Sequence, residues 1–346
     1  MAVVKSDFHG RHSGSWSSVW VRCCEEEGLP HELVDWRSMD SFDQLAANDI
    51  VVWHFSHYSS EEMHFARSIL VALKASGCTV FPDVGDADHF DDKIAQSYLL
   101  RGLGLATPRN YPLHSEWAVD QWIREVGAFP VVAKLRAGSG ATNVQLIKDG
   151  EQLSGYAKRM FGRGFNSKPS ALFKLSSNVA SSRSIADVVA RMKRIPEFLF
   201  SLRSAKSRER ERGYVYLQEF VPDVDYDLKV VVVGDRLSFI GRTVRQGDFR
   251  ASGGGDLFYD RSRIDKSIID TAFSAADALG SNCMGLDMIT DPRSDLPLIL
   301  EISYGFSHTA LLAAGGYYDR TGVWCNAPLN APEELLKNLV KKALSK

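Results

Sequence analysis

Two short apolar segments near the C-terminal end constrain the fold most. They span residues 286–290 and 298–303 and are joined by the turn-forming sequence Asp-Pro-Arg-Ser-Asp. Apolar runs of this length on either side of such a turn predict a β-hairpin. The turn is centred near Ser294, so Asp287 and Glu301 lie equally far from its centre. We therefore expect the two acids to face each other across the hairpin.

Two facing acids suggest a metal site. Like charges at directly opposed positions destabilise a sheet, and the cost rises in an apolar setting. A divalent cation removes that cost, and carboxylate oxygens suit Mg²⁺ or Mn²⁺ holding a substrate phosphate. The spacing alone also allows a solvated hairpin face that carries two unrelated acids.

Length and composition restrict the class of protein. The chain has 346 residues, which is too long for one ordinary core and suits two or three linked lobes. Its hydrophobic content of 45% and charged content of 24% are typical of a soluble globular protein. No apolar run approaches the ~18 residues of a membrane span, and no signal peptide is expected. Five cysteines without a Cys-x-x-Cys spacing indicate free thiols in a reducing, cytoplasmic compartment.

A basic segment covers residues 158–212. It contains 14 Lys and Arg against 4 Asp and Glu, whereas the rest of the chain contains 27 against 39. Helices are expected at residues 185–195 and 198–206. The charge suggests an insert that faces an anionic partner, although a solvated helical pair or adsorption to anionic lipid would give the same pattern. The few aromatic residues offer no stacking platform for a specific nucleic acid.

The first 85 residues alternate short apolar strands with helices. We expect strands at residues 2–5, 31–35, 49–55 and 78–81, and helices at residues 16–27 and 60–76. This order favours a parallel sheet covered on both faces, with ligands at the carboxyl ends of its strands. The loops at residues 6–15 and 54–58 would lie there, although their histidines also fit ordinary polar loops.

Two glycine-rich loops suit anions. The first follows Lys134, which ends an apolar strand at residues 129–135, and it contains Ser139 and Gly140. The ammonium supplies charge, and glycines let backbone N–H groups approach anionic oxygens. The sequence is not a Walker loop, and a purely structural hairpin would look the same. The second loop, at residues 242–255, carries Arg242 and Arg250, and its alternative is a mobile surface loop.

The remaining sequence predicts a series of helices and strands. Helices are expected at residues 90–102, 116–126, 264–279 and 332–345. Strands are expected at residues 214–219, 228–233 and 237–242, with a linker at residues 220–227.

Seven motifs in this order resemble the ATP-grasp superfamily, and most closely its carboxylate–amine ligases of the glutathione synthetase, RimK and D-alanine–D-alanine ligase branch. The motifs are Asp92-Lys93, Phe129-Pro-Val-Val-Ala-Lys134 with its glycine loop, Tyr216-Leu-Gln-Glu-Phe-Val221, Asp227-Leu-Lys229, Arg242 with Gly247-Asp-Phe-Arg250, Gly285-Leu-Asp287 and Glu301-Ile-Ser303. The resemblance covers residues 86–305. It implies a mixed α/β and α+β fold, in which an N-terminal parallel-sheet domain (1–88) precedes a two-lobed ATP-grasp fold (89–215 and 216–346).

The resemblance also implies roles for individual residues. Residues similar to the family's ATP contacts are Lys93, Lys134, Ser139, Gly140, Gln218, Glu219, Phe220, Val221, Asp223 and Asp227. Within this set, Lys93 and Lys134 look like the phosphate contacts, Glu219 and Val221 like the adenine-binding hinge, and Asp223 like the ribose contact. Ligands for Mg²⁺ or Mn²⁺ would be Asp287, Glu301 and Ser303. Residues expected to act on the activated acyl group are Lys229, Arg242 and Arg250.

Two positions depart from the family pattern. Ser303 stands where the metal strand usually carries asparagine, which puts a second metal site in doubt. Lys229 replaces a more common arginine and supplies a point charge instead of a bidentate fork.

The activity that the resemblance implies is ATP-dependent formation of an amide through an acyl phosphate, with release of ADP and phosphate. The partners would be ATP, a carboxylate substrate and an amine acceptor. Candidate acceptors are an amino acid, an amino sugar or a glycan precursor, and the basic segment favours an anionic one. Alternatives are an ATP-binding module without turnover and, less favoured, a nucleic-acid binder. The sequence also allows the chain to form a homodimer.

Overall fold

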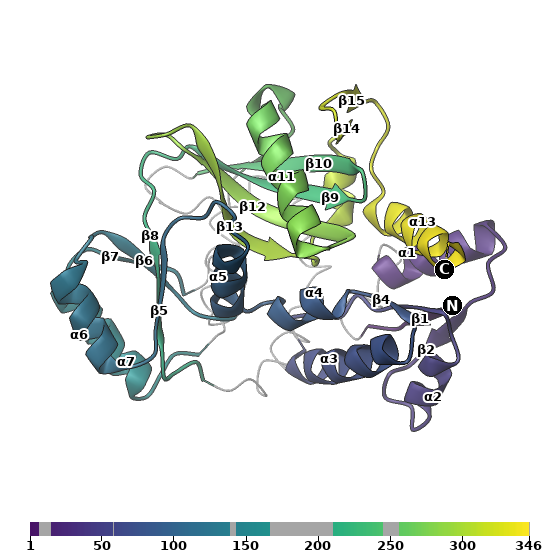
Figure 1. The fold of residues 1–346 in the computed structure, drawn as a ribbon, viewed down its shortest axis with the longest axis horizontal. Helices are drawn as coiled ribbons and strands as arrows, with labels where there is room; N and C mark the ends of the chain where they lie inside the picture. Colours follow the sequence, from purple (N-terminus) through teal and green to yellow (C-terminus); the bar gives the residue numbers. More distant parts are fainter. Residues whose placement is uncertain (7–14, 58, 139–142, 167–209, 245–255, 346) are drawn as a thin grey trace, which may run out of the picture. The chain divides into compact units, whose positions relative to one another are not determined.

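The computed structural model describes residues 1–6, 15–57, 59–138, 143–166, 210–244 and 256–345. They belong to two compact units (Figure 1). Unit 1 combines residues 1–56, 61–108 and 221–346, and unit 2 combines residues 57–60 and 109–220. The three-part division inferred from the sequence stays a prediction. The helices predicted at residues 185–195 and 198–206 lie outside the described residues.

Unit 1 begins with a parallel four-stranded sheet in the order β2-β1-β3-β4. Its strands are β1 (Ala2–Val4), β2 (Glu32–Val34), β3 (Ile50–Val52) and β4 (Thr79–Phe81). The helices of this region are α1 (Trp16–Glu26), α2 (Ser41–Ala46), α3 (Ser60–Ala75) and α4 (Val84–His89). Every residue of β1, β3 and β4 is buried, as expected for parallel strands covered on both faces. The predicted N-terminal parallel sheet is confirmed; α2 and α4 were not predicted.

A seven-stranded antiparallel sheet forms the rest of unit 1, in the order β13-β12-β9-β10-β14-β15, with β11 paired to β10. The strands are β9 (Tyr226–Val233), β10 (Arg236–Thr243), β11 (Leu257–Phe258), β12 (Cys283–Asp291), β13 (Leu296–Ser303), β14 (Tyr317–Asp319) and β15 (Trp324–Cys325). The helical elements are α5 (Lys93–Gly102), η3 (Arg261–Arg263), α11 (Lys266–Leu279), α12 (His308–Leu312) and α13 (Ala331–Leu344).

Both faces of this sheet are covered over β9. Leu228, Val230 and Val232 share a core with α11, which runs along the sheet in Figure 1. Val231 and Val233 alternate with them, and they belong to the core that includes the N-terminal sheet and α13. Successive strand residues point to opposite faces, so the unbroken apolar run of β9 reflects burial on both sides.

Unit 2 contains an antiparallel four-stranded sheet in the order β5-β8-β6-β7. Its strands are β5 (Asn110–Leu113), β6 (Val131–Lys134), β7 (Gln145–Ile147) and β8 (Val215–Glu219), and its helices are α6 (Glu116–Glu125) and α7 (Gly150–Phe161). Strand β5 was not predicted because it contains Pro112, which lacks a backbone N–H. It is an edge strand, where proline is tolerated.

Within the described part of the chain, no helix has the length and apolar character that crossing a membrane requires.

Candidate functional site

The predicted hairpin is present, and its two acids are opposed. Asp287 of β12 pairs directly with Glu301 of β13, so both side chains lie on the same face of the sheet. The register shifts immediately afterwards, because Met288 pairs with Ile299 and leaves Leu300 as the extra residue of a bulge. The turn is centred between residues 293 and 294. The prediction of facing acids is confirmed, but the bulge creates this register, and the sequence analysis did not include it.

The same sheet face carries charges on β9 and β10. Asp287 pairs with Lys229 on its other side, and Asp227, two residues before Lys229, pairs with Arg242. Residues two apart on a strand share a face, so the charged side chains form a continuous group. We call this group the charged cluster, and it consists of Asp227, Lys229, Arg242, Asp287, Glu301 and Lys93.

Short ion pairs hold the charged cluster together. The Lys229 Nζ atom lies 2.7 Å from Asp287 Oδ1, and Arg242 Nη2 lies 3.0 Å from the same oxygen. Arg242 also binds Asp227 with two nitrogens, Nε at 2.7 Å and Nη2 at 2.6 Å. Such a fork fixes the guanidinium plane. Asp287 therefore contacts two cations, of which Arg242 is also held by Asp227.

Lys93 supplies the third cation from the first turn of α5. Its Nζ atom lies 3.2 Å from Glu301 Oε1, and the residue is buried. The helix begins at Lys93 and not at the predicted Phe90, because the Asp92 side chain accepts hydrogen bonds from the backbone N–H groups of Ile94 and Ala95.

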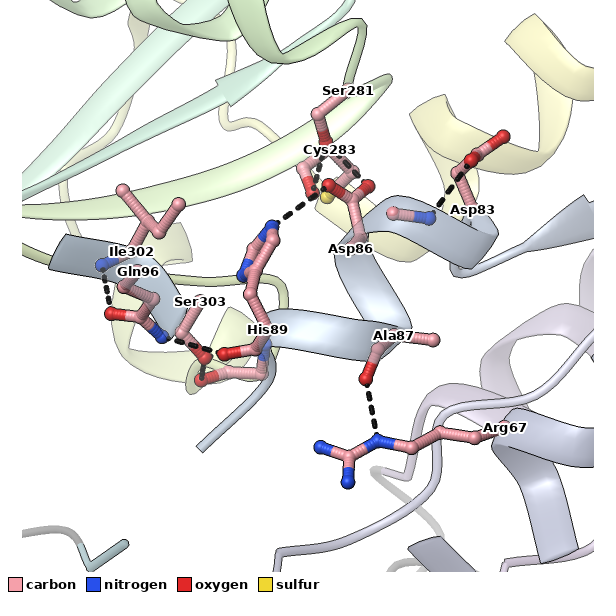
Figure 2. Close-up of polar contacts among 12 residues, drawn as sticks. Arg67, Asp83, Asp86, Ala87, His89, Gln96, Ser281, Cys283, Ile302 and Ser303 are labelled. Atoms are coloured by element: carbon pink, nitrogen blue, oxygen red, sulfur yellow. Dashed lines mark hydrogen bonds and ion pairs between the residues drawn. The ribbon is translucent and has the colours of Figure 1, made fainter. Parts of the chain in front are cut away.

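Gln96, one turn further along α5, joins this helix to the β12–β13 hairpin. Its Nε2 donates to the carbonyl of His89 at 2.9 Å, and its Oε1 accepts from the backbone N–H of Ile302 at 3.2 Å. Figure 2 shows the Gln96 side chain between these two backbone groups. Because Ile302 follows Glu301, this bridge fixes Lys93 and Glu301 relative to each other.

Helix α4 is tied to the same region (Figure 2). Asp86 accepts a hydrogen bond from Ser281 at 2.8 Å, and His89 Nε2 lies 3.7 Å from Asp86 Oδ1. Arg67 donates to the carbonyls of Ala87 and Phe90. The carboxylate stands between the hydroxyl and the imidazole, and Asp86 and His89 are buried, so this is a structural contact and not an activated nucleophile.

Electrostatics keep the central groups ionised. Burial by itself raises the pKa of the Asp287 carboxyl, but Lys229 and Arg242 outweigh it and hold the pKa below its usual value. Burial alone would lower the pKa of Lys93, yet Glu301 and Asp91 raise it above the ordinary value. Burial raises the pKa of Asp227 to about 6, against the opposing effect of Arg242. The pKa shifts of Asp287 and Lys93 therefore both favour the charged form at neutral pH.

In unit 2, Lys134 ends β6 and belongs to a polar network. Its Nζ contacts Gln218 Oε1, and Gln218 Nε2 donates to Asn110 Oδ1 at 3.0 Å. Tyr216 donates to the same oxygen at 2.8 Å. Glu219 follows, and its carboxylate accepts from the backbone N–H of Arg109 at 3.2 Å. The network fixes Lys134 and Gln218 on one strand pair, and sequence reasoning missed Asn110 because β5 was not predicted.

Comparisons with known proteins agree with this architecture. The chain resembles the crystal structure of a RimK domain ATP-grasp protein from Sphaerobacter thermophilus, with a TM-score of 0.53 and 15% identity over 98% of this chain and 99% of that one. It resembles Bacillus anthracis D-alanine–D-alanine ligase complexed with ATP, with a TM-score of 0.56 and 12% identity over 99% and 96% of the two chains. The chain has the ATP-grasp fold. The resemblance predicted from the seven motifs is confirmed at this level.

Two further proteins are similar to this chain. It also resembles the ATP-grasp ligase PsnB complexed with a phosphomimetic variant of a minimal precursor, Mg and ADP, with a TM-score of 0.56 and 14% identity over 99% and 98% of the two chains. In sequence it is 24% identical over 260 residues to the tetrahydromethanopterin:α-L-glutamate ligase of Methanosarcina acetivorans. That alignment spans 74% of this chain and 66% of the relative, just under two thirds. No family model matches the sequence.

Other residues assigned from the ATP-grasp resemblance differ in how far the structure describes them. Ser139, Gly140 and Arg250 lie outside the described residues, as do residues 167–209 of the basic segment. Val221 is buried, and Asp223 has a left-handed backbone with a φ of 57°. The Ser303 hydroxyl accepts from the Gly305 N–H at 3.0 Å and stabilises its own turn. Its role as a metal ligand stays a prediction, as do the other assigned roles.

The structure corrects the prediction for His54, which was expected in a loop at the ligand crevice. This imidazole is 3% exposed and stacks on Trp16, with ring centroids 4.5 Å apart and an interplanar angle of 5°. It is part of the aromatic core and not a polar loop residue. The neighbouring tryptophan explains the error, because sequence spacing alone does not show that the two rings stack.

The residues present fit a divalent cation that arrives with phosphate. In the described part of the chain, no three His, Cys, Asp or Glu side chains gather into a metal-binding group. Asp287 and Glu301 provide two carboxyl groups on one face, and Mg²⁺ commonly uses one or two carboxylates and completes its shell with phosphate oxygens and water.

Proposed function

We propose that this chain is an ATP-dependent ligase that joins a carboxylate to an amine through an acyl phosphate and releases ADP and phosphate. The observation that carries the proposal is the opposed pair Asp287 and Glu301, whose carboxylates contact the basic side chains of Lys93, Lys229 and Arg242 in an ATP-grasp fold. That grouping matches the need of phosphoryl transfer to an anion, in which negative charges must be brought together and stabilised.

The proposal gives each group a role. Asp287 and Glu301 hold Mg²⁺ or Mn²⁺, which when bound neutralises oxygens of the triphosphate. Lys93 and Lys134 contact the phosphates, together with the loop of Ser139 and Gly140. Asp227 is assigned to ATP binding through its hold on Arg242. Residues assigned to the adenosine part of ATP are Gln218, Glu219, Phe220, Val221 and Asp223.

The reaction proceeds in two displacements. An oxygen of the substrate carboxylate attacks the γ-phosphorus, and the bond to the β,γ-bridging oxygen breaks, so ADP leaves with that electron pair. The amine then attacks the acyl carbon, phosphate leaves, and the nitrogen loses a proton to give the amide. Arg242, Arg250 and Lys229 stabilise the negative oxygens of the acyl phosphate. Positioning and charge do the catalysis, so no protein nucleophile is required.

The activities of similar proteins suggest a class of amine substrate. One relative is a glutamate ligase and one structural neighbour is a D-alanine–D-alanine ligase, so an α-amino acid is the preferred amine substrate. An amino sugar or another glycan precursor is the next class to test.

The test is release of ADP with panels of carboxylates and amino acids. We expect ADP release that depends on both substrates and on Mg²⁺, and its loss in Asp287→Asn. Asp270→Asn is the matched control, because Asp270 lies on α11, is exposed and pairs with Lys266. Binding of ATP without ADP release under any acceptor would instead identify a nucleotide-binding module. Equal rates in wild type and Asp287→Asn would refute the proposal.

A further inference from the structure

The contacts around Asp287 bear on how a metal can reach it. One carboxylate oxygen, Oδ1, accepts both Lys229 at 2.7 Å and Arg242 at 3.0 Å. Arg242 shares its charge with Asp227 through the bidentate contact, whereas Lys229 forms its ion pair in the charged cluster with Asp287. Lys229 is therefore the specific counter-ion of the carboxylate that the proposed function assigns to the metal.

The backbone keeps this ammonium in place. Lys229 and Asp287 are directly paired residues of β9 and β12. Directly paired residues have Cβ atoms about 4.5–5.5 Å apart, so the side chains meet without a loop movement. Both side chains are largely buried, with exposed fractions of 16% and 17%. Water screens such a pair less than a surface pair, and the attraction is correspondingly stronger.

Glu301 is neutralised in the same way by Lys93. In the charged cluster, three acids face three bases, all held by contacts of 3.2 Å or less. A divalent cation alone would bring two positive charges next to Lys229 and Arg242 without any added anion. A cation with a triphosphate brings both signs of charge, so the bases can transfer to phosphate oxygens while the acids take the metal.

We propose that Lys229 is a built-in counter-ion of Asp287 that makes the metal site depend on nucleotide: divalent metal alone binds weakly, and it binds well only together with ATP. The inference rests on the proposed function, since it concerns the same two carboxylates. It adds an order of binding, in which no stable protein–metal complex precedes the nucleotide.

The experiment titrates Mn²⁺ into the full chain without nucleotide and follows free Mn²⁺ by electron paramagnetic resonance. Lys229→Met removes the counter-ion and should bind Mn²⁺ at least ~10-fold tighter than wild type, because a repulsive charge a few ångströms away is gone. Lys229→Arg keeps the charge and should behave as wild type. Lys266→Met removes an exposed lysine that pairs with Asp270 on α11, and it should also behave as wild type.

Folding is checked by circular dichroism, and Lys229→Gln replaces Lys229→Met if the latter does not fold. Tight Mn²⁺ binding by the nucleotide-free wild type, or no gain in the Lys229→Met and Lys229→Gln variants, would overturn the inference. A second arm adds a non-hydrolysable ATP analogue. Suppose that the analogue strengthens Mn²⁺ binding to wild type, but the variants bind Mn²⁺ no more tightly than wild type when the analogue is absent. The counter-ion role of Lys229 is then wrong and the proposed function stands. If the analogue has no effect, the proposed function itself fails.

Discussion

The two faces of the large sheet in unit 1 use the same strands for different purposes. The face toward α11 is apolar along β9, β10 and β12, with Leu228, Phe239 and Leu286 all buried. The other face begins apolar, at Val231 and Val233, and becomes charged at Lys229 and Asp287. The face toward α11 therefore contributes mainly to folding. The other face carries charged side chains in place of some apolar ones, and the strand register fixes their positions.

The largest effect on stability is expected on the apolar face. Phe239→Ala should lower the free energy of unfolding by about 3–5 kcal/mol, because Phe239 is fully buried and the change leaves a cavity. Urea denaturation measures this loss, and the KM for ATP should stay unchanged where the variant is folded. A raised KM with little loss of stability would break the division between the two faces.

The stability of the protein is expected to depend on pH through His308, which lies in the core next to the charged face. His308 is buried against Trp16, and burial lowers its pKa to about 4 from an unfolded value near 6.5. The unfolded chain therefore takes up this proton first, and stability present above pH 6.5 is lost as the pH falls toward 4. The loss should be about 3 kcal/mol. Denaturation at a series of pH values should show this slope, which His308→Phe should reduce; an unchanged slope in that variant would rule out His308 as its source.

The charged face should control turnover. Asp287→Asn and Lys134→Ala are each expected to reduce the rate of ADP release per folded molecule by at least ~10²-fold, roughly 3 kcal/mol of transition-state stabilisation. The rate is measured with saturating ATP and the carboxylate and amine that give ADP release in the substrate panels, with Asp270→Asn as control. Near-normal rates in both variants would show that the charges serve structure alone.

A smaller effect is expected where the charged face meets α5. Gln96→Leu leaves the buried His89 carbonyl and Ile302 N–H without their side-chain partner and should cost about 2 kcal/mol of stability. It should also raise the KM for ATP, since Lys93 and Glu301 lose their common support. Gln96→Glu keeps an acceptor for Ile302 and should recover part of both losses. If Gln96→Leu and Gln96→Glu have the same stability and the same KM for ATP, the Gln96 bridge does not position Lys93.

The sequence predicted the parts of the fold that have strong local patterns. The apolar strands of the N-terminal sheet follow from local sequence patterns. The hairpin that carries Asp287 and Glu301 follows from its turn residues, whereas the exact pairing of the two acids also needs the bulge at Leu300. Helix α4 was missed because it is short and polar, with only the Asp83 cap as a signal. The Lys134–Gln218–Asn110 network was missed because its members are far apart in sequence and one strand contains proline.

Ion pairs between residues that are far apart in the chain are harder to predict from the sequence. Spacing identified Asp287, and the family resemblance identified Lys229, as separate candidates. Their ion pair depends on β9 and β12 being neighbouring strands, although more than fifty residues separate the two positions. Lys93 likewise reaches Glu301 only through the packing of α5 on β13. Local patterns and the family resemblance thus indicated the residues, and the tertiary structure shows which of them form ion pairs.

The extra residue Leu300 separates the hairpin into two independently aligned halves. Toward the tip, the strands follow the alignment set by residues 292–295; toward the acids, they follow one shifted by a single residue. Without this shift the tip alignment would continue and pair Asp287 with Leu300, so Glu301 would point to the opposite face of the sheet.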